Sequence, residues 1–331
     1  MEWRRISGCW RRSRRKFESE MLGKLLRRFD SVVIPHAAWE IALMRLGFAM
    51  LIFTNTPVYL GLPSQPHPTG LAHFFDFTFL SSTENLNLLR VVLTLALICY
   101  VCNFLMVPAL AAMLFSSVSC GTLSNSQGYI GHMVQPVSLA ILAQFLVACY
   151  YAFRRGSPSA LAGMPLGDHR VLVHAAKVAL LSCYVTAAIT KIERSDGKWI
   201  SRTPNLAVQI QKTTDDKYYN TLQPAPQHTK DLIRFVNEHP SWTKFIVGPS
   251  LFLEAFAFLA LMGRGWAFFI GIGLFIMHWM ISVAMQLNFL AMEMMVLIFV
   301  INVPFAVYFL ARKLAGSNVS QALVNARLRS Y

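Results

Sequence analysis

Residues 265–285 read GWAFFIGIGLFIMHWMISVAM, and this stretch decides the fold class. It contains no Asp, Glu, Lys or Arg, and it matches the ~20 apolar residues that an α-helix needs to cross the hydrocarbon core of a bilayer. Its only histidine, His278, stands in an otherwise uncharged sequence. Gly271 and Gly273 favour close packing against a neighbouring helix. The stretch therefore predicts a transmembrane helix.

Seven further stretches have a similar length and hydropathy, so we expect an all-α bundle of about eight transmembrane spans. They cover residues 38–60, 87–104, 106–122, 131–152, 170–192, 245–262 and 288–311. Asn103 and Pro108 mark the break between the second and third spans. The whole chain of 331 residues agrees, because 55% of it is hydrophobic and only 14% is charged. Typical soluble domains carry about 25% charged residues.

The net charge of +14 follows the expected topology. Ten basic and four acidic residues fall within residues 1–36, and basic residues recur in alternate connections and after the last span. Because Lys and Arg mark the cytoplasmic side, we expect both termini inside. The chain then divides into a basic cytoplasmic segment (1–36), a transmembrane domain (37–312) and a cytoplasmic tail (313–331). This distribution favours a lipid bilayer as partner and argues against nucleic acid.

Residues 193–244 form the one long connection, and the topology places it outside the cytoplasm. Its mixed charges are tolerated because the positive-inside rule weakens in loops of about this length. Residues 228–238 have the pattern of a short amphipathic helix on the membrane surface. Trp199 and Trp242 flank the connection as interfacial anchors.

A few ionisable residues remain inside the predicted spans, where each costs about 2.5–3.5 kcal/mol on insertion scales. Lys191, His132 and His278 fall at similar depth near the outer face, and they come from three different spans. A buried lysine loses its proton more readily and can act as a base, and histidines can relay protons. Arg45 and Glu254 form a candidate structural or proton-linked pair.

Simpler interpretations of the same residues stay open. Lys191 can extend to the interface, and either histidine can make a helix–helix hydrogen bond. The nine histidines show no H-E-x-x-H or comparable ligand spacing, so the sequence predicts no metal site.

Four segments follow one another in a recognisable order. They are Ala42-Leu43-Met44-Arg45-Leu46-Gly47, then Gly131-His132, then YVTAAITK at 184–191 followed by Trp199, and finally the series Glu254, Arg264, His278 and Phe289. In order and spacing they resemble the HTTM superfamily, the transmembrane module shared with vitamin K-dependent gamma-carboxylases. The resemblance extends over residues 37–312. Ala188 stands where the family usually has Gly, and Gly131 stands where it has Asn.

This resemblance implies a role for each matching residue. Lys191 would be the base that deprotonates a hydroquinone, His132 would stabilise the reacting species, and His278 would line the same cavity. The implied cofactor is a quinone or hydroquinone. The chain carries no counterpart of the large extracytoplasmic domain of the carboxylases. It therefore resembles the single-domain bacterial members, which implies a multi-pass protein of the bacterial inner membrane.

Two functions of different classes follow from these observations. The first is a carboxylase-like membrane enzyme that acts on a lipid-soluble or peptide substrate in an outer-leaflet cavity. The second is a non-catalytic accessory or lipid-binding protein for the maturation or export of secreted peptides. A transporter is a third possibility, which the lack of an evident inverted repeat weakens. The sequence leaves open whether the protein is an enzyme.

Overall fold

The architecture is known from a computed structural model. It describes residues 36–55, 65–127, 134–155, 163–285 and 287–314. Within these ranges every regular element is helical, so the all-α prediction is confirmed. Six of the helices are long and apolar enough to cross a membrane, which indicates a multi-pass membrane protein. They are α2 (Ala38–Asn55), α3 (Thr83–Val101), α4 (Met106–Asn125), α5 (Val134–Arg155), α7 (Leu166–Arg194) and α12 (Arg264–Met285).

The last span is bent. Helix α13 (Leu290–Met295) continues into η6 (Val296–Ile301), and a second arm, Val303–Leu314, leaves at an angle of 51°. Asn302 joins the two arms with a φ of 54°, in the left-handed region that asparagine tolerates better than most residues. The number of apolar spans rises from six to seven if the two arms are counted as one span.

Residues 245–262, predicted to be one span, do not form one continuous helix. The chain there consists of three short helices, α10 (Pro240–Val247), α11 (Pro249–Ala255) and η5 (Ala257–Leu261). Pro249 has no backbone N–H to donate to the preceding turn, so the helix cannot continue unbroken through it. The predicted count of eight spans is therefore not confirmed for the described ranges.

The predicted break between α3 and α4 is confirmed at Asn103. Asn103 and Leu105 adopt positive φ values of 59° and 47°. The Asn103 side chain also donates to the carbonyl of Met164 and accepts from its N–H, each at 3.0 Å. Pro108 lies in the first turn of α4, where a missing N–H costs little. Asn103 thus fixes the α3–α4 turn against the chain that enters α7.

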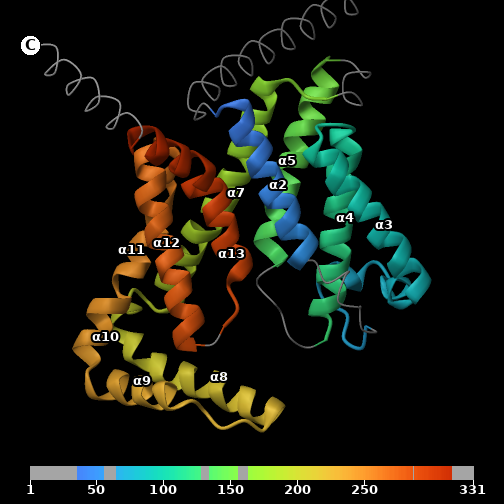
Figure 1. Ribbon diagram of the computed structural model, residues 1–331. Helices are drawn as coiled ribbons and strands as arrows, with labels where there is room; N and C mark the ends of the chain where they lie inside the picture. The colour runs from blue at the N-terminus through green and yellow to red at the C-terminus, as the bar shows by residue number, and fades with distance from the viewer. Residues whose placement is uncertain (1–35, 56–64, 128–133, 156–162, 286, 315–331) are drawn as a thin grey trace, which may run out of the picture.

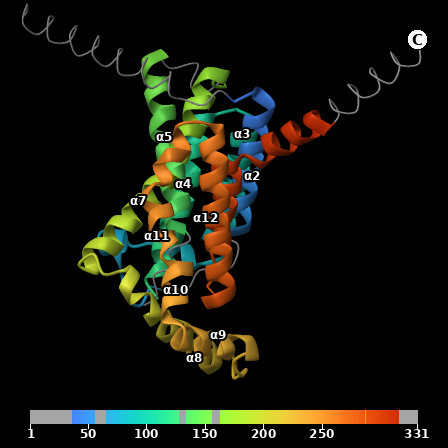
Figure 2. The same cartoon turned by 90° about the vertical axis from the view of Figure 1, so that its left-hand side faces the viewer.

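Short helices lie in the connections that follow α2 and α7. They are η2 (Gly70–His73), η3 (Thr78–Ser81), η4 (Ile200–Asn205), α8 (Leu206–Thr221) and α9 (Gln227–Glu238). Helix α9 confirms the amphipathic helix predicted over 228–238, with Thr229 and Val236 buried on one face. Helices α8 and α9 lie across the end of the bundle opposite to the one where α2 begins (Figures 1 and 2).

The first and last described helical segments lie at the same end of the bundle (Figure 1). Helix α2 begins, and Val303–Leu314 lies, at the same end (Figure 1). The segment from α10 to η5 is not among the helices that are long and apolar enough to cross a membrane. Of the predicted segments 1–36 and 313–331, only His36, Lys313 and Leu314 fall within the described residues.

Helix α7 holds the bundle together, because it packs against α5, α11, η5 and η6. In the adjoining core, the rings of Phe48 and Phe299 meet edge to face with centroids 5.0 Å apart. The close packing predicted at two glycines of α12 is confirmed. A Cβ at Gly271 would lie 2.5 Å from Ile301 Cγ1, and one at Gly273 would lie 2.9 Å from a Leu253 methyl carbon.

Candidate functional site

Lys191 and Glu254 form an ion pair where α7 packs against α11. Lys191 lies three residues before the end of α7, and its Nζ donates to both carboxylate oxygens of Glu254, at 2.7 Å and 2.6 Å. The Glu254 side chain is 6% exposed, whereas that of Lys191 is 31% exposed. A carboxylate so removed from water needs a partner to stay ionised, and Lys191 supplies it.

The predicted pairing of Arg45 with Glu254 is wrong. Arg45 lies in α2, where its Nε and Nη1 are buried and have no hydrogen-bond partner within the described ranges. Glu254 instead bonds to Lys191, because α11 packs against α7. The sequence identified Glu254 as a buried acid but carried no information about which helix lies beside it.

Tyr184 and His278 form a second polar contact on the same side of α7. Tyr184 lies two turns before Lys191, and its hydroxyl is 2.8 Å from His278 Nε2 on α12. The His278 ring stacks on Phe289, with centroids 4.9 Å apart. The other ring nitrogen, Nδ1, is buried and has no hydrogen-bond partner in the described part of the chain.

The residues of these two contacts are close enough for their charges to interact. The charge of Lys191 acts on His278, and the charges of Glu254 and Glu293 act on Tyr184. The indole ring of Trp199 lies 5.0 Å from Lys191 Nζ, a distance at which its π-face attracts a cation.

We call this set the loop-side cluster, because it lies toward α8 and α9. It comprises Tyr184, Lys191, Trp199, Glu254, His278 and Glu293. Two predicted site residues, Lys191 and His278, thus lie in the same cluster. The third, His132, lies outside the described residues. The catalytic role of all three stays a prediction.

Two members of the cluster had weaker signals in the sequence. The only sequence observation that included Tyr184 was the resemblance of the YVTAAITK segment to the HTTM superfamily. Glu293 is a single acid in the last apolar stretch, and the structure buries it with its Oε1 accepting from Ser282 Oγ at 3.1 Å. Its spacing from the other residues did not indicate a shared site.

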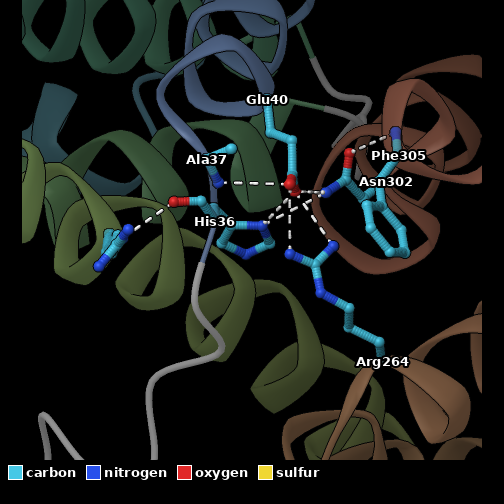
Figure 3. Close-up of polar contacts among 7 residues, drawn as sticks. His36, Ala37, Glu40, Arg264, Asn302 and Phe305 are labelled. Atoms are coloured by element: carbon cyan, nitrogen blue, oxygen red, sulfur yellow. Dashed lines mark hydrogen bonds and ion pairs between the residues drawn. The ribbon is translucent and has the colours of Figure 1, made fainter. Parts of the chain in front are cut away.

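A second polar cluster lies at the opposite end of the bundle, and the sequence did not predict it. Its centre is Glu40, in the first turn of α2 (Figure 3). The Glu40 Oε2 accepts from Arg264 Nη1 at 3.1 Å and from Asn302 Nδ2 at 2.8 Å, and it lies 3.0 Å from His36 Nδ1. Oε1 accepts from Arg264 Nη2 at 3.3 Å and from the Ala37 N–H at 3.2 Å.

We call His36, Glu40, Arg264 and Asn302 the Glu40 cluster. His36 lies just before α2, where burial lowers the pKa of its imidazole and favours the neutral ring. The Arg264 guanidinium also lies over the Phe305 ring, 3.7 Å from its centroid. An available signal was the topology, which placed Glu40 and Arg264 at the same end of the bundle. In the sequence, Arg264 was a member of the HTTM-like series, which did not indicate Glu40 as its partner.

The described chain therefore carries two groups of buried ionisable residues, one at each end of a bundle of apolar helices. The loop-side cluster combines an accessible amine with a desolvated carboxylate, and the Glu40 cluster satisfies its carboxylate completely. The first joins α7 to α11, whereas the second holds α2, α12 and the bent span together. In comparisons with known proteins, no protein-family model, curated protein or solved structure matches the chain.

Proposed function

We propose that this chain is a membrane enzyme of HTTM type, in which Lys191 removes a proton from a lipid-soluble hydroquinone. One observation carries the proposal: an amine that retains access to its surroundings is hydrogen-bonded to both oxygens of a buried carboxylate. This arrangement gives the amine a nearby group that can take its proton. A lysine that merely extends to the interface needs no such partner.

The proton transfer balances within the pair. Lys191 starts as an ammonium and Glu254 as a carboxylate, and one proton moves from Nζ to a carboxylate oxygen at 2.6–2.7 Å. The neutral amine then takes the hydroxyl proton of the hydroquinone. The products are an ammonium, a neutral Glu254 and a hydroquinone monoanion, so the total charge is unchanged.

Tyr184 and His278 would support the anion. When the Tyr184 hydroxyl donates to Nε2 of His278, the ring carries its proton on Nδ1. Nδ1 has no partner in the described residues, so its N–H is not committed to another hydrogen bond. By the family resemblance, His132 would also contribute.

The finer features of the membrane assignment belong to the same proposal. We place the protein in a bacterial inner membrane, with residues 1–36 cytoplasmic and the loop-side cluster toward the outer leaflet. The apolar character of the helices supports access by a lipid-soluble or peptide substrate from the bilayer. The basic segment supports the orientation.

The test is the protonation state of a bound probe. A naphthohydroquinone with a short isoprenoid tail is added anaerobically to the full chain in lipid nanodiscs at neutral pH. We expect the absorbance of the hydroquinone anion with the natural protein. Lys191→Arg keeps a positive partner for Glu254 but cannot give up its proton. It should therefore bind the probe without producing the anion.

Lys198→Met is the matched control, because Lys198 is exposed on the same segment and lies outside the cluster. It should behave like the natural protein. An undiminished anion signal in Lys191→Arg would overturn the assignment of the base. If the natural protein also fails to bind the probe, the non-catalytic accessory function gains support.

A further inference from the structure

A cavity of about 650 Å³ opens beside the Glu40 cluster, far from the loop-side cluster. Its apolar wall is formed by α12, the end of η6 and the arm Val303–Leu314. The aromatic and aliphatic side chains of this wall are Phe268, Phe269, Phe299, Phe305, Phe309 and Leu310. The volume falls within the range of about 300–1,000 Å³ that is typical of small-ligand sites.

The cavity is open rather than enclosed, and apolar side chains stand at its opening. Phe269 is 72% exposed and Phe309 is 58% exposed, although both line it. Phe299, at the back of the cavity, is 1% exposed. A hydrocarbon chain could therefore enter from the membrane without crossing a polar barrier.

Lys177 supplies the polar end of the cavity. The residue is 3% exposed, lies on α7, and has no hydrogen bond or ion pair with any residue in the described ranges. An unpaired ammonium in such surroundings is costly, and buried charges in proteins normally have a partner. The Lys177 side chain is therefore an unsatisfied cation on the wall of an otherwise apolar cavity.

The neighbouring ionisable groups do not neutralise Lys177. Arg264 repels it, and Glu40 is already bonded to Arg264 and Asn302. His36 and His174 are the other titratable groups nearby, and neither carries a negative charge. The polar end of the cavity therefore has an excess of positive charge.

The bend at Asn302 gives the cavity its outer wall. Asn302 Oδ1 accepts from the Phe305 N–H at 3.3 Å and so caps the second arm, while its Nδ2 donates to Glu40. This places Phe305 and Phe309 on the cavity, with their rings stacked at 6.1 Å. The aromatic wall and the Glu40 cluster are thus parts of one structure.

We propose that this cavity binds a single-chain anionic amphiphile, with its hydrocarbon chain along the aromatic wall and its carboxylate or phosphate head on Lys177. The head supplies the negative charge that the described residues do not provide. The apolar wall selects a chain rather than a soluble anion. The site is separate from the loop-side cluster and does not depend on the function proposed there.

The test uses a palmitate analogue with a diazirine in its chain, photolysed with the delipidated full-length protein in nanodiscs. Peptide mass spectrometry should map the label to the first turns of α12 and to Val303–Leu314. Lys177→Met should reduce the labelling about tenfold, equivalent to about 1.4 kcal/mol of binding free energy. Lys313→Met, an exposed lysine at the same end of the bundle, should leave it unchanged.

A second variant and a second probe test the apolar wall and the charge of Lys177 separately. Ala306→Phe adds bulk to the cavity wall without altering charge and should also abolish labelling. A diazirine alcohol of equal chain length should label weakly, because it has no charge for Lys177. A lysophosphatidate analogue that labels better than palmitate would identify a phosphate head, and the reverse would identify a carboxylate.

Three outcomes would overturn the proposal. These are equal labelling by the alcohol, labelling confined to other helices, and protection of the cavity by a segment of the chain itself. Lys177→Met should also raise the melting temperature of the delipidated protein, since it removes an unpaired buried charge. The hydroquinone assay at Lys191 should be unaffected, so failure of one proposal leaves the other standing.

Discussion

Two lysines of α7 show how differently the amine of a helix residue can be accommodated. Lys191 is bonded to both oxygens of Glu254, whereas Lys177 has no partner in the described ranges. Loss of a buried ion-pair partner destabilises a protein because the other charge is left desolvated. Removal of a buried charge that has no partner should do the opposite.

The Lys191–Glu254 pair can be tested by stability. Lys191→Met should lower the free energy of unfolding by about 3 kcal/mol, the low end for breaking a buried pair, because Lys191 is 31% exposed. Glu254 would remain as an unpaired buried acid. The double variant Lys191→Met with Glu254→Leu should recover most of the loss. Denaturant unfolding in micelles measures both, and a double variant no more stable than the single one would contradict the pairing.

Single residues were predictable as unusual, but their partners were not. The cost of charge in a membrane identified Lys191, Glu254 and His278 from the sequence alone. The partner of Glu254 was predicted to be Arg45 and is Lys191, because helix adjacency depends on packing that the sequence does not display. The place of Lys177 on the wall of a cavity likewise depends on helix packing and is visible only in the structure.

The architecture of the bundle depends on where its helices are interrupted as well as on where they form. Asn103 was predicted to end α3, and its side chain bonds to Met164 across the turn. The helical segment around Pro249 was predicted to be continuous, because its apolar composition masked the effect of the proline. Hydropathy thus located the elements, and local backbone chemistry decided whether each was continuous.

The bend at Asn302 gives a prediction for an element. Asn302→Ala removes the cap of Val303–Leu314 and the bond to Glu40, and it places alanine at a φ of 54°. We expect a loss of about 2–3 kcal/mol, since a lost cap costs about 1 kcal/mol and the left-handed conformation a further 1–2 kcal/mol. Asn302→Gly should lose less, because glycine accepts this φ. Thermal unfolding would compare them, and equal losses would rule out a backbone contribution.

The whole molecule is organised by two ends of different chemistry. The start of α2 and the helices α8 and α9 lie at opposite ends of the bundle (Figure 1). The Glu40 cluster and the cavity include residues at the start of α2, whereas Lys191 lies in the last turn of α7, which leads toward α8. The basic residues that dominate the net charge of +14 predict which end faces the cytoplasm.

The orientation can be measured with single cysteines on a background that lacks the six native ones. Asn220→Cys in α8 should react with a membrane-impermeant maleimide added to intact cells. Arg154→Cys, near the end of α5, should react only after permeabilisation. The reverse pattern would invert the proposed topology, and labelling of both from outside would exclude it.

Helix α7 runs unbroken for 29 residues and carries both Lys177 and Lys191. At 1.5 Å per residue the two lysines are about 21 Å apart along its axis, less than the ~30 Å thickness of the hydrocarbon core. The continuous helix therefore fixes the distance between the two sites along its axis. When a thinner bilayer makes such a helix tilt, the separation of its ends across the membrane shrinks. In a thinner bilayer, a larger tilt of α7 would therefore bring Lys177 and Lys191 closer to the bilayer midplane at the same time.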